Sequence, residues 1–395
     1  MDTKFAGRMT DYEAGIFQEL NEQKLQVEAA GGKVYNFSVG TPDFEPAQHI
    51  IDAVVNAAKK PENYKYSLMD LPELLDAVIL RYRKRYGVEL ARNEITSVYG
   101  SQEGITHLPF ALVDPGDVVL VPDPGYPVFS VGPSLAGAKV ETYDLYKEDG
   151  YLPHLDEIAK AHGKDAPAGE RARVMIVSYP LNPVCKCAPD AFYEELIGWA
   201  REQEILIIHD NAYSDIVYDG RTGRSILSFP GAKECCVEFY SLSKSFNYTG
   251  ARMSFLAGNE KVVQTFKRLR SQIDYGIFFP IQYGAIAALT GPDECVKEQC
   301  TEYEKRRNAL CDGFTEIGWP FERSQGSMFA WAKIPERFGN DDVAFVRELL
   351  QKTGVLCTPG RSFGPLGKGH VRFALVLPVP VIREAVEAVK QSGIL

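Results

Sequence analysis

The chain has 395 residues, of which 45% are hydrophobic and 24% are charged, and these values are ordinary for a soluble globular protein of two or three domains. Its formal net charge is −10, so the surface repels nucleic-acid backbones and anionic lipid, and we expect neither as a partner. A site for a small anion must therefore be built locally from arginine, lysine and backbone N–H groups.

Cysteine usage and the N-terminus exclude further classes. The eight cysteines are irregularly spaced and form no C-x-x-C pair, which indicates reduced thiols in a cytoplasmic protein rather than a zinc site. Met1–Leu20 carries Asp2, Asp11 and Glu13 and no apolar stretch, so we expect no signal peptide. No apolar run approaches the roughly 18 residues that a membrane-spanning helix needs. We therefore expect a cytoplasmic protein without a metal site or a membrane anchor.

In the middle of the chain, short β-branched runs alternate with longer amphipathic stretches. The runs are largely apolar, as expected for strands that are covered on both faces. Helical spacing follows Pro189 in residues 192–200 and recurs in residues 262–273. This alternation predicts an α/β fold with a mostly parallel central sheet covered by helices. The predicted strands are Val118–Val121, Val174–Tyr179, Ile205–His209, Val237–Tyr240 and Met253–Ala257.

The C-terminal part has a different pattern. Val343–Leu350 has helical spacing that stops at Gly354, and the glycine-rich turn Pro359–Gly364 precedes a short strand, Val371–Leu375. A last helix is predicted from Pro380 onward, and together these elements predict a smaller α+β domain. The expected division is a large domain over residues 46–285, a small domain over residues 286–395, and an N-terminal segment, residues 1–45, that packs with the small domain.

Polar side chains follow three successive predicted strands. In an open α/β sheet, ligands bind at the carboxyl ends of the strands, so residues at these positions are candidates for a binding site. The candidates are Asn182 after the second strand, Asp210 and Tyr213 after the third, Ser241, Ser243 and Lys244 after the fourth, and Arg252 just before the fifth.

This set of groups suits the ring of pyridoxal phosphate. The aldehyde of the cofactor needs an amine with which to form an imine, and Lys244 supplies one. The ring accepts electrons only if its nitrogen holds a proton, and a buried carboxylate such as Asp210 keeps that nitrogen charged. The phenolate oxygen needs hydrogen-bond donors, which the Asn182 amide and the Tyr213 hydroxyl can provide.

The phosphate of the cofactor needs positive charge and hydrogen-bond donors. Arg252, Ser241 and Ser243 can supply both. The turn formed by Gly100, Ser101 and Gln102 lies between a predicted strand, Thr96–Tyr99, and a helical pattern, so it can direct backbone N–H groups at the phosphate. Tyr126, which follows the first strand through Pro124-Gly125, can stack on the face of the ring.

Each of these residues also has an ordinary interpretation. A Ser-x-x-Lys sequence such as Ser241–Lys244 occurs in serine β-lactam enzymes, although there the serine begins a helix. Asp210 could cap a helix or bind magnesium, Asn182 suits a turn, and Tyr126 is by default a half-buried aromatic. The order of these groups at successive strand ends, taken jointly, favours the cofactor site.

The sequence resembles the class I/II aminotransferases of fold type I over nearly the whole chain. Val39–Phe44 resembles the early glycine-rich loop of that family, and Asn63–Tyr66 with Leu71–Leu74 resembles its tyrosine segment. Ser241-x-Ser-Lys244 with Arg252 resembles the cofactor-lysine motif. Gly360–Gly369 with the following Val371–Phe373 resembles the C-terminal arginine motif. The nearest subgroup resembles the LL-diaminopimelate aminotransferases.

The resemblance implies roles beyond the strand ends. Gly40, Asn182 and Arg372 are expected to contact the substrate, with the Arg372 guanidinium matching the α-carboxylate in two places. Tyr66 is expected to reach the cofactor phosphate held by the other subunit, which implies a homodimer with shared active sites. The partners are therefore a second copy of the chain and small amino acids and 2-oxo acids.

Several positions depart from the pattern of the family. The family usually has Gly where Asp70 stands and Arg where Leu75 stands. It also commonly has Gly two residues after the proline that follows its Asn, whereas Pro183 is followed here by Val184 and Cys185. Asn211 replaces a frequent Glu. None of these changes removes a group that the cofactor needs.

The expected function is transamination by a ping-pong reaction. Lys244 acts as general base at the substrate α-carbon, Asp210 stabilises the ring charge, and Tyr213 assists as the third catalytic residue. A lyase or decarboxylase on the same scaffold is the alternative, because the same cofactor residues serve these reactions. A regulatory ligand-binding domain is less favoured, since no N-terminal extension offers room for a DNA-binding module.

Overall fold

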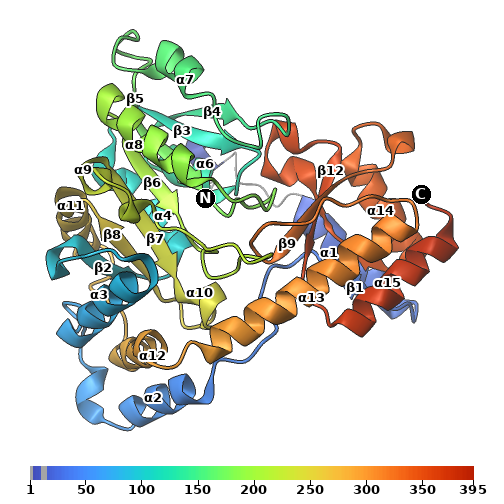
Figure 1. Cartoon of the computed structure of the whole chain (residues 1–395), viewed down its shortest axis with the longest axis horizontal. Helices are drawn as coiled ribbons and strands as arrows, with labels where there is room; N and C mark the ends of the chain where they lie inside the picture. The colour runs from blue at the N-terminus through green and yellow to red at the C-terminus, as the bar shows by residue number, and fades with distance from the viewer. Residues whose placement is uncertain (1–2, 10–15) are drawn as a thin grey trace. The chain divides into compact units, whose positions relative to one another are not determined.

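The computed structural model describes residues 3–9 and 16–395, which form two compact units (Figure 1). The small unit comprises the described residues of Met1–Gly40 together with Glu304–Ser324 and Met328–Leu395, and the large unit comprises Thr41–Tyr303 and Gln325–Ser327. The division at Tyr303 and Glu304 falls within the long helix α13 (Glu294–Glu316). The domain boundaries expected at residues 45 and 285 stay predictions.

The large unit is built on one sheet, which within the described residues has seven strands in the order β2-β8-β7-β6-β5-β3-β4. All neighbours are parallel except at β8, which is antiparallel to both β7 and β2. The predicted α/β fold with a mostly parallel sheet is therefore confirmed. The strands are β2 (Ile95–Val98), β3 (Val118–Asp123), β4 (Lys139–Asp144), β5 (Ala172–Ser178), β6 (Leu206–Asp210), β7 (Cys236–Ser241) and β8 (Ser254–Gly258).

Helices cover both faces of this sheet (Figure 1). On one face, apolar side chains of the strands, such as Ile208 and Phe239, pack with α4, α6 and α11. On the other face, Tyr82 of α3 donates a hydrogen bond to Glu238 at 2.9 Å, and Tyr193 of α8 contacts His209. The helices of the large unit are α2 (Gln48–Ala58), α3 (Pro72–Tyr86), α4 (Ser101–His107), α5 (Pro109–Leu112), α6 (Val128–Leu135), α7 (Leu155–His162), α8 (Asp190–Gln203), α9 (Ala232–Cys235), α10 (Leu242–Ser245), α11 (Glu260–Arg270) and α12 (Phe279–Thr290).

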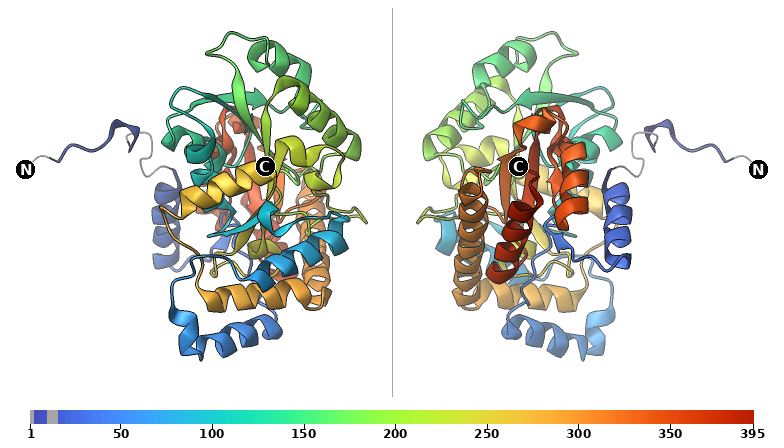
Figure 2. Two further views of the ribbon diagram at one scale, coloured as in Figure 1. Left: turned by 90° about the vertical axis from the view of Figure 1, so that its left-hand side faces the viewer. Right: turned by 90° about the vertical axis from the view of Figure 1, so that its right-hand side faces the viewer.

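Local sequence accounts for most of these boundaries. Each of the five predicted strands is present, with ends that differ by one or two residues. The helix predicted from Val262 stops at Arg270, so Ile273 lies beyond it and is 47% exposed. A close approach at Gly284 lets α2 lie along α12, because a Cβ there would stand 2.5 Å from Val54; the two helices are side by side in both views of Figure 2.

The small unit has the α+β composition that the sequence predicts. An antiparallel sheet has the order β11-β12-β9, and a short parallel pair joins β1 to β10. Gly354 ends α14 in the left-handed conformation, at φ 73°, where a Cβ would stand 2.0 Å from the Lys33 carbonyl oxygen. The elements are α1 (Ile16–Ala29), β1 (Tyr35–Asn36), β9 (Phe329–Lys333), α14 (Asp342–Thr353), β10 (Val355–Leu356), β11 (Thr358–Pro359), β12 (His370–Ala374) and α15 (Val379–Ser392).

Among the residues that the structure describes, none of the helices combines the length and the apolar character needed to cross a bilayer.

Candidate functional site

The carboxyl ends of β5, β6 and β7 bring the predicted polar residues to one edge of the large sheet. These three strands are parallel neighbours, and Asp210 stands opposite Ser178 of β5 and Phe239 of β7. Asn182 follows β5 within four residues, and Lys244 follows β7 within three. The topology therefore gathers at one edge residues that are distant in the sequence.

Asp210 is the most unusual group at this edge. Its side chain is 8% exposed, and its Oδ1 is buried without a hydrogen-bond partner. Burial raises the pKa of Asp210 to about 6, although His209 and the Ala212 backbone N–H act in the opposite direction. A buried carboxylate with an unused oxygen suits a cationic N–H group of a ligand, since such a partner would offset the cost of burial.

Lys244 lies on a turn that neighbouring residues hold on both sides. Ser241 ends β7 and caps α10, because its hydroxyl accepts a hydrogen bond from the Ser243 backbone N–H at 3.2 Å. The Gln299 amide donates to the Lys244 carbonyl oxygen at 2.8 Å, and Ser245 donates to Asp215 at 2.7 Å. The backbone that carries the amine is therefore fixed next to the strand end.

Asp215, which no sequence motif marks, holds this turn by accepting the hydrogen bond from Ser245. Its buried carboxylate also accepts hydrogen bonds from Tyr240, Arg81 and Arg85 at 2.8, 3.1 and 3.0 Å. Burial alone would raise the pKa of Asp215, but the two guanidinium groups lower it to about 2. An Asp five residues after Asp210 shows no local motif, so only the fold reveals its part in holding the lysine turn.

A second cluster joins Arg252 to the glycine turn before α4. Gly100 has a φ of +84°, which favours glycine, and a Cβ there would stand 2.3 Å from an Arg252 guanidinium nitrogen, so the arginine lies directly against this turn. The Ser101 hydroxyl is buried without a hydrogen-bond partner. Next to it, the Gln102 amide oxygen accepts a hydrogen bond from the Tyr126 hydroxyl at 3.0 Å. Arg252 and the turn formed by Gly100, Ser101 and Gln102 can therefore serve one anionic group, and the Tyr126 ring adds an aromatic face.

The remaining predicted site residues lie in different surroundings. Asn182 and Tyr213 are 5% and 7% exposed, so neither residue faces bulk water. Tyr66 instead is 80% exposed, and its ring lies 5.6 Å from that of Tyr275. Nothing in the large unit covers most of the Tyr66 ring, which is consistent with contact to another molecule.

Gly40 and Arg372 belong to the small unit, where Phe329 contacts both. The Arg372 guanidinium lies 4.0 Å from the centre of the Phe329 ring and 4.5 Å from that of Phe363, and it donates to the Ser38 carbonyl oxygen at 3.4 Å. A Cβ on Gly40 would stand 2.6 Å from the Phe329 ring. The two aromatic rings hold a 7% exposed guanidinium in place.

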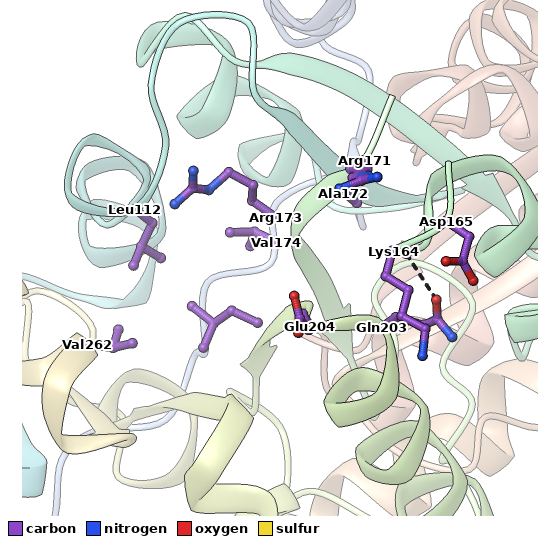
Figure 3. Close-up of a pocket in the computed structure, with 11 residues that line it drawn as sticks. Leu112, Lys164, Asp165, Arg171, Ala172, Arg173, Val174, Gln203, Glu204 and Val262 are labelled. Carbon is purple, nitrogen blue, oxygen red and sulfur yellow. Dashed lines mark hydrogen bonds between the residues drawn. The ribbon is translucent and has the colours of Figure 1, made fainter. Parts of the chain in front are cut away.

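A cavity of about 560 Å³ lies elsewhere in the large unit (Figure 3). It is lined by Ala172 and Leu206, which stand at the amino ends of β5 and β6, opposite the edge that carries Asp210. Its cations are already engaged, since Arg173 pairs with Asp117 at 3.4 Å and Arg171 donates to the Ala166 carbonyl oxygen. This cavity is not part of the candidate site.

The geometry at the carboxyl edge fits pyridoxal phosphate. The Asp210 Oδ1 and the Ser101 hydroxyl are buried there without hydrogen-bond partners. Lys244 lies on a turn that neighbouring residues hold in place, and the Arg252 guanidinium lies against Gly100. Among the described residues, no group of three His, Cys, Asp or Glu side chains is arranged to hold a metal ion.

The chain is similar to known aminotransferases over nearly its whole length. The family described as aminotransferase class I and II matches residues 32–389. The LL-diaminopimelate aminotransferase of Halothermothrix orenii is 39% identical over 98% of this chain and 98% of its own length. The glutamate-pyruvate aminotransferase AlaC of Escherichia coli is 37% identical and covers 95% of this chain and 90% of its own.

Solved structures show the same architecture. Substrate-bound BacF from Bacillus subtilis superimposes with a TM-score of 0.91 at 32% identity and covers 98% of each chain. A probable N-succinyldiaminopimelate aminotransferase from Thermus thermophilus has a TM-score of 0.87 at 32% identity, over 96% of this chain and 100% of its own. Likeness of this extent confirms the predicted fold type.

Proposed function

Because the chain belongs to the aminotransferase class I and II family, we propose that Lys244, Asp210 and Arg252 surround its pyridoxal phosphate at the carboxyl edge of the large sheet. The chain is a pyridoxal-phosphate-dependent transaminase of fold type I, which moves an amino group between an amino acid and a 2-oxo acid by a ping-pong reaction. The names of its curated relatives give no support to the lyase or decarboxylase alternative. The observation that carries our placement of the cofactor is the buried, partnerless Asp210 Oδ1.

The proposed roles follow from the chemistry of each group. When bound, pyridoxal phosphate supplies an electrophilic carbon and a ring that accepts electron density from the substrate. Asp210 holds a proton at the ring nitrogen, because the ionised carboxylate is stabilised by the resulting cation. Asn182 and Tyr213 donate to the phenolate oxygen, and Tyr126 stacks on the ring. The phosphate is held by Arg252, Ser101, Gln102, Ser241 and Ser243.

Lys244 and Arg372 are proposed to act on the substrate itself. The Lys244 amine removes the proton from the substrate α-carbon, and the braced turn keeps the amine within reach of that carbon. Arg372 binds the α-carboxylate through its planar guanidinium, with Asn182 and the backbone near Gly40 as further contacts. Fixing the carboxylate orients the Cα–H bond for removal of the proton.

We propose that one substrate of the pair carries a second carboxylate. Both curated relatives described above are named for such a compound, diaminopimelate in one case and glutamate in the other. The net charge of −10 gives the surface no general attraction for an anion. Local cations must therefore select the substrate.

A screen of amino donors tests this proposal. LL-diaminopimelate and lysine, a monocarboxylic donor of similar size, are each offered with 2-oxoglutarate, glutamate is offered with pyruvate, and formation of the new amino acid is measured. We expect kcat/KM for the better dicarboxylic donor to exceed that for lysine by about 100-fold, because a group that pairs with a second carboxylate would be left without its partner by lysine. Equal values for the two classes of donor would contradict the proposed substrate class.

We further propose a homodimer in which Tyr66 serves the active site of the partner. Exposed apolar side chains gather near Tyr66 on two segments that contact each other through the Tyr66–Tyr275 and Tyr64–Phe278 ring pairs. Such a patch is typical of a protein–protein interface. The exposed members are Tyr64, Tyr66, Leu68, Met69, Ile273, Tyr275 and Phe278.

Heterodimers with two differently tagged chains test the shared site. If Tyr66→Ala and Lys244→Ala lie on opposite chains, one site keeps both groups, and about half of the wild-type activity is expected at limiting cofactor. The matched control carries both substitutions on one chain and none on the other, which leaves no site complete. A tyrosine that serves its own subunit would give the reverse result, with activity in the control and little in the test dimer.

A cytoplasmic location is also proposed. All eight cysteines are free thiols, which suits a reducing compartment.

A further inference from the structure

Asp70, in the loop before α3, accepts three hydrogen bonds from a buried strand of the large sheet. Its Oδ2 accepts hydrogen bonds from the Ser97 backbone N–H at 3.0 Å and from the Thr96 hydroxyl at 3.3 Å, and its Oδ1 accepts a short one from the Ser97 hydroxyl. Ser97 and Thr96 are buried residues of β2, at 0% and 3% exposure. The carboxylate therefore ties the loop before α3 to a strand of the central sheet.

β2 leads directly into the proposed phosphate site. Two residues separate its last residue, Val98, from Ser101, and the turn between them contains Gly100, which contacts Arg252. On the same strand the Ser97 carbonyl oxygen accepts a short hydrogen bond from Arg270, which is itself paired with Asp274 at 2.9 Å. Asp70 thus binds a strand whose position is already determined by other elements.

Tyr66 lies in the same loop, four residues before Asp70. Gln282, a fully buried residue of α12, holds this loop: its Oε1 accepts from the Leu71 backbone N–H at 2.9 Å, and its Nε2 donates to the Ser67 hydroxyl at 2.8 Å. Gly276 packs against the Ser67 carbonyl, where a Cβ would stand only 2.3 Å away. The segment Ser67–Leu71 is therefore rigidly anchored, while the Tyr66 ring beside it is 80% exposed.

From this geometry we propose that Asp70 is a positioning residue for cofactor binding: it fixes the segment that presents Tyr66 relative to the strand that leads into the phosphate turn. The inference rests on the proposed role of Tyr66 at the cofactor phosphate of the partner. An exposed tyrosine loses side-chain and backbone conformational freedom when it binds. Because Asp70 and Gln282 already hold the adjoining backbone segment in place, less conformational entropy is lost on binding. Asp70 thereby increases the affinity for the cofactor without touching it.

A double-mutant cycle on cofactor affinity tests the inference. The dissociation constant of pyridoxal phosphate is measured by equilibrium dialysis for the wild-type dimer, Asp70→Asn, Tyr66→Phe and the double variant. We expect each single variant to weaken binding about tenfold, as for loss of one hydrogen bond to a charged group. Because Asp70 acts through Tyr66, the double variant is expected to remain near tenfold rather than reach about 100-fold.

Two further measurements separate positioning from general stability. Asp76→Asn is the matched control, since Asp76 lies on the adjoining helix and forms an exposed ion pair with Arg92; its cofactor affinity should match the wild type. Amide exchange of residues 66–71 without cofactor should be faster in Asp70→Asn and unchanged in Tyr66→Phe. Ser97→Ala removes one of the three hydrogen bonds to Asp70, that of the Ser97 hydroxyl, and should change affinity and amide exchange in the same direction as Asp70→Asn but by less.

The outcomes distinguish the inference from the proposed function. Additive losses in the double variant, or an effect of Asp70→Asn no larger than that of Asp76→Asn, would overturn the positioning role while leaving Tyr66 in place. If Tyr66→Phe alone leaves affinity unchanged, the role of Tyr66 fails and the inference fails with it. In that case, the assignment of the lysine and of the aspartate at the ring nitrogen still stands.

Discussion

Replacing Lys244 with alanine is expected to lower turnover by a factor on the order of 10⁴, because the variant lacks the amine that we propose moves the substrate proton. The visible absorbance that depends on a lysine-bound cofactor should disappear as well. The fold should persist, since the turn is held through backbone and neighbouring groups, Gln299 at the Lys244 carbonyl and Asp215 at Ser245. Stopped-flow absorbance and steady-state rates measure both effects.

Two controls make this experiment specific to Lys244. Lys261→Ala removes an exposed lysine of α11 and should leave rate and absorbance unchanged. A small primary amine added to the Lys244→Ala variant should restore part of the proton transfer, because the missing group is a base at a fixed place. Normal transamination by Lys244→Ala would show that another amine carries the cofactor.

Asp210→Asn is expected to have the second largest effect on activity, with turnover lowered by a factor on the order of 10³. An amide has no charge with which to keep a proton on the ring nitrogen, so the ring becomes a weaker electron acceptor. The Asn side chain has nearly the same shape, so the loss reports charge rather than packing. Unchanged turnover in Asp210→Asn would place the ring nitrogen away from β6.

The same substitution is expected to stabilise the cofactor-free protein near neutral pH. Burial raises the folded-state pKa of Asp210 from 3.8 to about 6, so the stability that this group contributes is fully present below pH 3.8 and is lost as the pH rises through about 6. At about pH 7.5 the ionised carboxylate then costs the apoprotein about 3 kcal/mol relative to a neutral residue. Asp210→Asn should recover most of this free energy.

Urea denaturation of the two apoproteins at several pH values measures the difference in free energy of unfolding. The advantage of Asp210→Asn should shrink as the pH falls and should vanish near pH 3.8, the ordinary value for the carboxyl group. An advantage that is independent of pH, or none at any pH, would show that the Asp210 carboxylate is better solvated than its burial indicates.

Local sequence was sufficient for much of the fold and for the candidate residues at the sheet edge. The runs Val118–Val121 and Val237–Tyr240, in which only Glu238 is charged, predicted strands covered on both faces, and neither strand lies at an edge of the sheet. Once parallel strands were expected, residues directly after them had to meet at one edge. Asp210 and Lys244 could therefore be selected together, although 34 positions separate them in the sequence.

The alternation of strands and helices, the family, and the groups that follow β5, β6 and β7 could all be predicted from the order of residues along the chain. The residues that hold those groups in place are evident only from the packed fold: Asp215 and Gln299 contact the lysine turn, and Asp70 and Gln282 contact the Tyr66 loop. The hydrogen bonds of Asp70 to Ser97 and of Gln282 to Ser67 join residues 27 and 215 positions apart. Such polar contacts leave no periodic pattern along the chain, because they depend on where whole elements pack rather than on the local conformation of either residue.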